Sequence, residues 1–284
     1  MTANSAITPT HATQLMKSKS TGRDYCIKIG LPQAYTPSPI KGWPFDNAPE
    51  SWPVIYLLDA DWYYGMVTDM IRPMAWCGGT SDAIVVGIGY PENADPQEAW
   101  REQQVRRNLD FTPIRDETTE RDWSKITGHR CLTGDAVHFL QYIQAELIPF
   151  IEKNYRADPT RRSLVGHSFG GLFAAFTLLN EPDLFSNYII GSPSLNYGNR
   201  FTFTCEEQFA ERQKQLSANV YLSAGELEES DTDTTVTDLL RFAAKLQSRN
   251  YTGLELRKQI FADLNHCEVV APGFQAGLKM MLKK

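Results

Sequence analysis

The chain has 284 residues, of which 42% are hydrophobic, and this size and composition suit one large globular domain. Its formal net charge of −6 disfavours general binding to nucleic acids or anionic membranes, because both would repel it. The five cysteines are widely spaced and form no CxxC pair, so the sequence predicts neither a zinc site nor a redox centre. We therefore expect no metal, no nucleic-acid partner and no membrane partner.

The first segment, 1–20, is rich in Thr, Ser and Ala and holds no run of apolar residues. We expect it to be disordered or loosely ordered, followed by a single domain over 21–284. The segment lacks the apolar core of a secretory signal, and no later segment approaches the length of a membrane span, so the sequence favours a cytoplasmic protein. No feature predicts a particular oligomeric state.

From residue 21 on, strand-like and helix-like segments alternate, which is typical of an α/β fold with a mostly parallel sheet. Tyr25, Ile27 and Ile29 alternate with polar residues and predict an early strand. Short apolar runs, as in strands covered on both faces, predict strands at 54–58, 83–88, 163–165, 188–190, 220–222 and 254–261. Helices are expected at 135–154, 171–179, 236–248 and 272–282.

The stretch 92–134 interrupts this alternation. It carries Trp100, Arg107, Trp123 and many acidic residues, with little periodicity. A connection of this length inside a compact domain usually has a function. We interpret it as an insertion at the rim of an active site.

The strongest motif is GHSFGG over 166–171. It follows the strand-like RSLV of 162–165 and precedes the helix-like LFAAF of 172–176. This strand–turn–helix order is the context of a nucleophile elbow, in which a strained turn lifts a serine above the sheet. Gly166 and Gly170 are expected to leave room for the neighbouring strand and helix. The alternative is a glycine-rich loop with a packing role alone, but the flanking pattern favours Ser168 as a nucleophile.

A serine hydroxyl needs a base to remove its proton. Among the five histidines, His266 lies in the sequence DLNHC, after the final predicted strand and before the last helix. That is where the base follows in chain order when a serine occupies an elbow of this kind. A purely structural histidine is the alternative. His167 adjoins the nucleophile, but we expect its side chain to point away from Ser168.

An acid should orient the base and should follow the strand that ends near residue 223. Two carboxylates in the sequence GELE of 225–228 qualify. We prefer Glu228, and Glu226 is the alternative. A Ser–His dyad without an acid also stays open.

The tetrahedral oxygen of such a reaction needs two N–H donors, an oxyanion hole. One should be the backbone amide of Phe169, directly after the nucleophile. The second should come from the turn after the strand-like YLLD of 56–59, from the amide of Asp61 or of Trp62.

These segments together resemble the putative esterase family of α/β-hydrolases, which includes siderophore esterases, S-formylglutathione hydrolase and feruloyl esterases. The resemblance rests on YLLD at 56–59, RNLDFTP at 107–113, the elbow, GSPS at 191–194, GELE at 225–228 and His266. The RxxDFTP segment is similar to the branch of enterochelin-type trilactone siderophore esterases. The chain departs from the family at 195–197, where LNY replaces frequent tryptophans, and at Ala60, where a glycine is usual.

The resemblance implies an α/β-hydrolase fold, with helices on both faces of a mostly parallel central sheet, and serine ester hydrolysis without a cofactor. It also suggests that Arg107 holds an anionic or carbonyl-bearing part of a small-molecule ester substrate. A salt bridge from Arg107 to Asp110 or to another acid is the alternative.

Three functions are compatible with these residues. The first is hydrolysis of a carboxylic ester, such as a siderophore or another bulky ester, through an acyl-enzyme. The second is acyl transfer from the same nucleophile to an alcohol or a thiol. The third is ligand binding without catalysis on a hydrolase scaffold. The presence of both Ser168 and His266 disfavours the third, whereas the choice between the first two depends on the access of water under 92–134, and we prefer hydrolysis.

Overall fold

The computed structural model describes residues 11–36 and 49–283. At its centre is an eight-stranded sheet with the strand order β1-β2-β4-β3-β5-β6-β7-β8. β2 pairs antiparallel with β1 and with β4, and the other neighbouring strands pair parallel. The predicted α/β architecture with a mostly parallel sheet is confirmed, and each predicted strand overlaps an observed one.

The strands are β1 (His11–Lys17), β2 (Asp24–Gly30), β3 (Trp52–Leu57), β4 (Ile84–Gly89), β5 (Ala157–His167), β6 (Asn187–Gly191), β7 (Gln215–Gly225) and β8 (Thr252–Phe261). The α-helices are α1 (Ala60–Trp76), α2 (Pro96–Phe111), α3 (Glu117–Thr127), α4 (Ala136–Tyr142), α5 (Ile148–Asn154), α6 (Phe169–Asn180), α7 (Tyr197–Arg212), α8 (Thr235–Ser248) and α9 (Val270–Met281). Short turns of other helix types are η1 (Gln33–Tyr35), η2 (Ile143–Leu147) and η3 (Glu226–Glu228).

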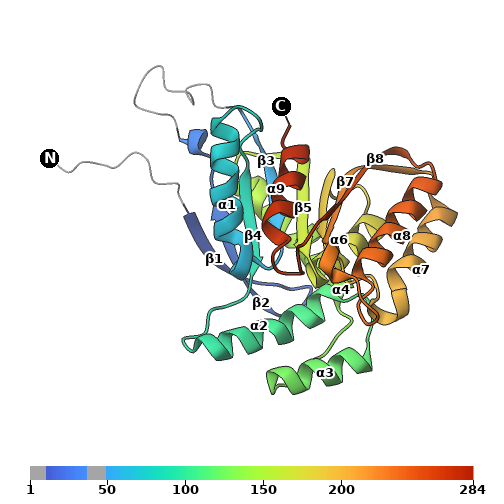
Figure 1. The fold of residues 1–284 in the computed structure, drawn as a ribbon. Helices are drawn as coiled ribbons and strands as arrows, with labels where there is room; N and C mark the ends of the chain where they lie inside the picture. Colours follow the sequence, from blue (N-terminus) through green and yellow to red (C-terminus); the bar gives the residue numbers. More distant parts are fainter. Residues whose placement is uncertain (1–10, 37–48, 284) are drawn as a thin grey trace.

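Helices cover both faces of the sheet (Figure 1). α1 and α9 pack on one face, and α4, α6, α7 and α8 pack on the other. Side chains along β3 alternate between the two cores, with Val54 and Tyr56 facing one and Ile55 and Leu57 facing the other. Among the described helices, none combines the length and the apolar character that a bilayer span requires.

The N-terminal segment differs from our expectation. Residues 11–17 form β1, which pairs along its whole length with β2, and the Glu146 carboxylate accepts hydrogen bonds from the amides of Lys19 and Ser20. The prediction that 1–20 is disordered or loosely ordered is therefore wrong for 11–20, and residues 1–10 lie outside the described residues. The strand escaped prediction because its side chains are almost all exposed, so its sequence carries no apolar alternation.

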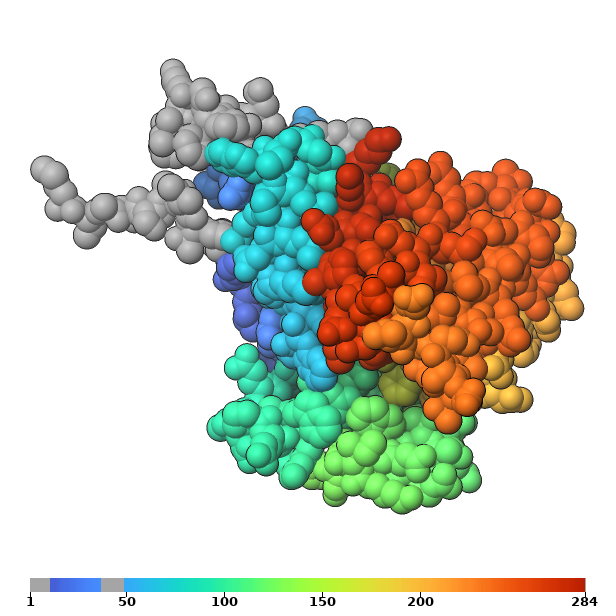
Figure 2. All heavy atoms as spheres, in the orientation of Figure 1, coloured from blue at the N-terminus to red at the C-terminus, as the bar shows by residue number. Residues whose placement is uncertain are grey.

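The stretch 92–134 contains two well-capped helices. The Asp95 side chain accepts a hydrogen bond from the Gln97 amide at the start of α2, and Asp116 accepts one from the Thr119 amide at the start of α3. Gly128, with a φ of 73°, ends α3. These helices form a projecting shelf, green in Figures 1 and 2. Its interpretation as a rim insertion within one domain over 21–284 stays a prediction.

Candidate active site

Ser168 stands in the sharp turn between β5 and α6, with φ 60° and ψ −121°. This backbone conformation is unfavourable for a residue other than glycine, so surrounding contacts must impose it. The Ser168 amide donates to the Gly191 carbonyl over 3.0 Å, and the Ser168 carbonyl accepts from the amides of Leu172 and Ser194. The turn is thereby held from β6 and from α6, and it places a half-buried serine at the carboxyl end of β5.

Close approach explains two of the glycines around this turn. A Cβ atom on Gly166 would overlap the Gly170 carbonyl, and one on Gly171 would lie 2.7 Å from the Gly191 carbonyl oxygen. Gly170 is less confined, because a Cβ there would lie 3.3 Å from a carboxylate oxygen of Asp59. The expected clearance at Gly166 is observed, whereas Gly170 faces the Asp59 side chain.

His266 lies against Glu228. Its Nδ1 atom is 2.5 Å from Oε2 of the Glu228 carboxylate, whose residue is only 2% exposed. The other oxygen, Oε1, accepts hydrogen bonds of 2.7 Å from the Ser192 hydroxyl and from the Gly225 amide. Burial alone would raise the pKa of Glu228, but these hydrogen bonds outweigh it and lower the pKa below its ordinary value. The carboxylate is therefore ionised at neutral pH.

The two carboxylates of the GELE segment point in different directions. Glu226 is exposed, and its side chain accepts a hydrogen bond of 3.1 Å from the Asp263 amide. Both residues belong to η3, a tight turn of three residues per turn, in which positions two apart project from different sides. Glu228 thus faces His266, and Glu226 does not.

The loop after β8 reaches the elbow through a contact between two histidines. The rings of His266 and His167 lie 4.5 Å apart, centroid to centroid, and His167 directly precedes Ser168 in the chain. His167 is buried, with its ring against the edge of Tyr63. Burial, with a smaller contribution from the neighbouring His266, lowers the pKa of His167 to about 3. His167 is therefore neutral at neutral pH, and its ring packs beside that of His266.

The amides predicted to form the oxyanion hole differ in whether they already donate a hydrogen bond. Within the described chain, neither the Phe169 amide nor the Asp61 amide has a hydrogen-bond partner. The Trp62 amide, by contrast, donates to the Asp59 carbonyl over 3.0 Å. Because the Trp62 amide is engaged in this way, Asp61 is the better placed of the two residues predicted to supply the second donor, and that assignment stays a prediction.

Arg107, from α2, is paired with Asp59. Its Nε and Nη2 atoms lie 2.9 and 3.0 Å from the two carboxylate oxygens of Asp59. The side chains are 11% and 5% exposed, so the pair is almost fully enclosed. Asp110, the other acid considered, instead pairs with Arg23. The geometry is that of an internal salt bridge, which the sequence left as the alternative to a substrate contact.

Residues 18–261 match the sequence profile of the family described as Putative esterase. The chain belongs to that family. This esterase is 33% identical to the ferri-bacillibactin esterase of Bacillus subtilis over 233 residues, which are 80% of this chain and 74% of that protein. It is 29% identical over 167 residues to the siderophore enterobactin esterase of Emericella nidulans, covering 58% of this chain and 53% of the relative. It is therefore a carboxylic ester hydrolase.

Solved structures share the fold of this chain. The BES protein from Bacillus cereus superimposes on this esterase with a TM-score of 0.76 at 29% identity, over 100% of this chain and 97% of that one. The siderophore hydrolase EstB from Aspergillus nidulans gives a TM-score of 0.79 at 21% identity, over 97% and 96% of the two chains. The predicted α/β-hydrolase fold and the predicted family are both confirmed.

Aromatic side chains gather around the elbow of this esterase. The ring of Phe169 lies 6.4 Å from that of Trp123 on α3 and 5.7 Å from that of Tyr197 on α7. Trp62 is 52% exposed, and its indole N–H donates to Gln103 over 2.6 Å. Tyr197 lies in the segment where the chain departs from the family pattern. Tyr197 is buried and supports Phe169, while the accessible parts of Trp62, Trp123 and Phe169 offer flat apolar surfaces to a bulky substrate.

Two supporting residues were not found by sequence reasoning. Ser192, with a φ of 36°, donates its hydroxyl to Glu228, and the GSPS segment after β6 was its available signal. Asp59, at the end of the YLLD segment, reads as a turn-forming residue, and its partner Arg107 is 48 positions away. Among the described residues, no group of three or more His, Cys, Asp or Glu side chains could hold a metal ion.

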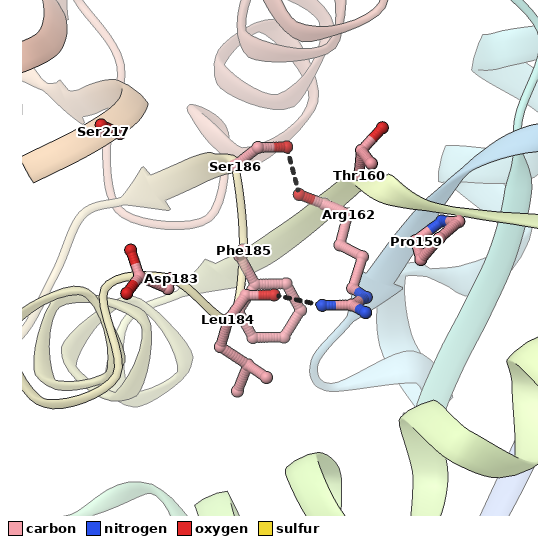
Figure 3. A pocket seen from close by; sticks show the side chains of 8 residues that line it. All are labelled: Pro159, Thr160, Arg162, Asp183, Leu184, Phe185, Ser186 and Ser217. Carbon is pink, nitrogen blue, oxygen red and sulfur yellow. Dashed lines mark hydrogen bonds between the residues drawn. The ribbon is translucent and has the colours of Figure 1, made fainter.

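A separate cavity of about 150 Å³ lies near the beginnings of β5 and β6 (Figure 3). Arg162, on β5, donates to the Leu184 carbonyl there and accepts a hydrogen bond on its own carbonyl from the Ser186 hydroxyl. Because Ser168 follows the opposite end of β5, this cavity is separate from the candidate active site.

Proposed function

We propose that this esterase cleaves its substrate through a triad of Ser168, His266 and Glu228. The observation that carries the proposal is the 2.5 Å contact between Nδ1 of His266 and the buried, ionised Glu228, beside a nucleophile elbow. A carboxylate at Nδ1 favours the tautomer with its proton there, which leaves Nε2 free to act as a base. Ser168 stands on a strained turn directly after His167, whose ring lies 4.5 Å from that of His266, and this supports the pairing of nucleophile and base that the mechanism requires.

The reaction would proceed in two halves. Nε2 of His266 takes the proton of the Ser168 hydroxyl while Oγ attacks the ester carbonyl carbon. The amides of Phe169 and Asp61 then stabilise the negative oxygen, assisted by the positive end of α6. Collapse breaks the bond to the alcohol, which leaves with the proton from His266. Water activated by His266 hydrolyses the acyl-enzyme and releases the acid.

As substrate we propose a siderophore ester or another bulky ester with aromatic parts. The ring of Trp62 is exposed and those of Trp123 and Phe169 are half-buried, so these three rings are accessible to such a ligand, whereas the buried Tyr197 packs behind Phe169. The relatives named for bacillibactin and enterobactin support the same class. The His266 side chain is 45% exposed, so water can reach the base. This exposure favours hydrolysis over acyl transfer, and the partition of product in the presence of an added alcohol measures the difference.

Replacing the nucleophile tests the mechanism. We expect Ser168→Ala to abolish turnover of a 4-nitrophenyl ester and labelling by a fluorophosphonate, because no other group has the place of Oγ. The matched control is Ser217→Ala, an exposed serine at the start of β7 that lines the separate cavity of Figure 3. It should keep both. Ester turnover that survives Ser168→Ala would remove Ser168 from the mechanism.

A further inference from the structure

We propose that Arg107 is a positioning residue of the oxyanion hole, which acts by keeping the Asp59 carboxylate away from the first amides of α1. This role rests on the proposed function of Ser168. It replaces the expectation that Arg107 contacts the substrate, and it assigns the buried ion pair a role in the reaction.

The starting observation is an aspartate that does not cap its helix. Asp59 immediately precedes α1, where an aspartate side chain normally accepts a hydrogen bond from the second or third helical amide. Those amides belong to Asp61 and Trp62. Here Asp59 makes no such bond, and its backbone has φ 52° and ψ 44°, in the left-handed region, instead of the extended conformation of a capping residue. The Asp61 amide consequently stays available to an oxyanion.

The second observation is what holds Asp59 in that state. Both of its carboxylate oxygens are bound by the guanidinium of Arg107, in a planar two-pronged arrangement. The preceding amide, that of Leu58, is fixed to the Val165 carbonyl on β5 over 2.9 Å. A strained residue persists when its surroundings leave it no alternative, and these contacts supply that restraint from both sides.

The third observation links Arg107 to the other donor. Its guanidinium carbon lies 5.5 Å from the ring centroid of Phe169, whose amide begins α6, and 5.6 Å from that of Phe111. A cation over an aromatic ring is attracted to it, so both rings help to hold the guanidinium in place. Arg107 thus contacts the two segments that carry the proposed donors, the turn at Asp59 and the ring of Phe169.

The same geometry disfavours a direct contact between Arg107 and the substrate. The guanidinium is almost fully enclosed, and Nε and Nη2 are already committed to Asp59. An anionic substrate would have to displace a desolvated, doubly hydrogen-bonded carboxylate, which would leave Asp59 buried without a partner.

The test is a rescue experiment on a small neutral ester, 4-nitrophenyl acetate, with active sites counted by a fluorophosphonate. We expect Arg107→Gln to lower kcat by roughly 10- to 100-fold, with KM changed less than about threefold. The upper end of that range corresponds to the loss of one oxyanion donor. The freed Asp59 would then cap α1. The double variant Asp59→Gly, Arg107→Gln should recover at least about fivefold in kcat over the single variant, because glycine accepts the left-handed conformation and cannot cap.

Controls separate this role from a purely structural one. Arg101→Gln, on an exposed position of α2, should keep the kcat of the unmodified enzyme. A structural role would lower the temperature of unfolding and the number of titratable sites, but not kcat per site. If Arg107→Gln yields too little folded protein, Arg107→Lys, alone and with Asp59→Gly, gives the same comparison, because a lysine loses the two-pronged contact.

Three outcomes would overturn the inference. Arg107→Gln with an unchanged kcat per site would do so, as would a double variant no faster than the single one. A loss confined to KM for anionic esters would return Arg107 to substrate binding. Failure of the proposed function gives a different result, namely turnover that survives Ser168→Ala.

Discussion

At the scale of single residues, hydrogen bonds hold the proposed acid in its ionised state. Glu228 accepts from three groups on three separate segments, namely His266 after β8, Ser192 after β6 and the Gly225 amide at the end of β7. An ionised carboxylate so fixed can orient the imidazole and stabilise the cation that forms during turnover.

We expect Glu228→Gln to lower kcat by about 10²- to 10⁴-fold with a smaller change in KM, because the amide can hold the wrong histidine tautomer. Steady-state hydrolysis of a 4-nitrophenyl ester measures this. Glu226→Gln is the matched control, since the exposed Glu226 binds only the Asp263 amide among the described residues. Equal losses in the two variants would contradict the assignment of Glu228 as the acid.

The same carboxylate should contribute a pH-dependent part of the stability. Its pKa in the folded protein lies below the ordinary value of 4.5. A carboxylate whose pKa is lower in the folded than in the unfolded protein stabilises the fold at any pH above its unfolded-state pKa. This stabilisation is lost as the pH falls through the folded-state pKa. The difference in unfolding free energy between the unmodified enzyme and Glu228→Gln, from urea titrations, should therefore shrink from about pH 7 to pH 3. A constant difference would contradict this.

At the residue level, the sequence predicts a role only where a local pattern carries the chemistry. Ser168 is marked by an elbow motif between a strand and a helix, and His266 by its place after the last strand. The choice between Glu226 and Glu228 was open because it depends on the rotation of a tight turn. The pairing of Arg107 with Asp59 joins residues far apart in sequence, so no spacing indicates it.

At the scale of elements, α2 shows why periodicity missed the helices of the rim. The residues of α2 that face the protein are mostly polar, so the helix has no apolar stripe. The buried residues of α2 are Gln103, Gln104, Arg107, Asn108, Asp110 and Phe111. Its Asp95 cap and the Pro96 that follows it are start signals, and they are weaker evidence than an apolar face.

The elbow between β5 and α6 provides a prediction at this scale. We expect Gly166→Ala to destabilise the fold by about 1–3 kcal/mol or more, because the added methyl group would overlap the Gly170 carbonyl. The control is Gly65→Ala on α1, where a Cβ meets no atom within 4 Å and should add about 0.5–1 kcal/mol of stability. Denaturant unfolding compares the two, and an equally stable Gly166→Ala would show that the turn has room.

At the scale of the whole molecule, the sheet carries the site and its first strand is peripheral. β1 lies at the end of the strand order, exposes nearly all of its side chains and precedes the segment that matches the family, 18–261. The mostly parallel sheet was predictable, because its central strands are buried on both faces and read as apolar runs. β1 was not predictable, because backbone pairing alone defines it.

Removing residues 1–17 should leave ester hydrolysis within about twofold of the full chain, because β1 buries little apolar surface. The melting temperature should fall by only a few degrees, about the effect of 1 kcal/mol in a chain of this size. Thermal unfolding and 4-nitrophenyl ester turnover of the shortened chain measure both. A shortened chain that aggregates or loses activity would show that β1 protects the edge of β2.

The ion pair between Arg107 and Asp59 limits how this enzyme can be re-engineered. Swapping 92–134 for the matching stretch of another esterase looks like a simple way to alter substrate preference, since α2 and α3 project from the body of the molecule. Yet α2 also supplies the guanidinium that occupies the Asp59 carboxylate. We expect a chimera whose grafted helix lacks an arginine at that place to have a new substrate preference and, at the same time, a kcat lowered by roughly 10- to 100-fold on every ester.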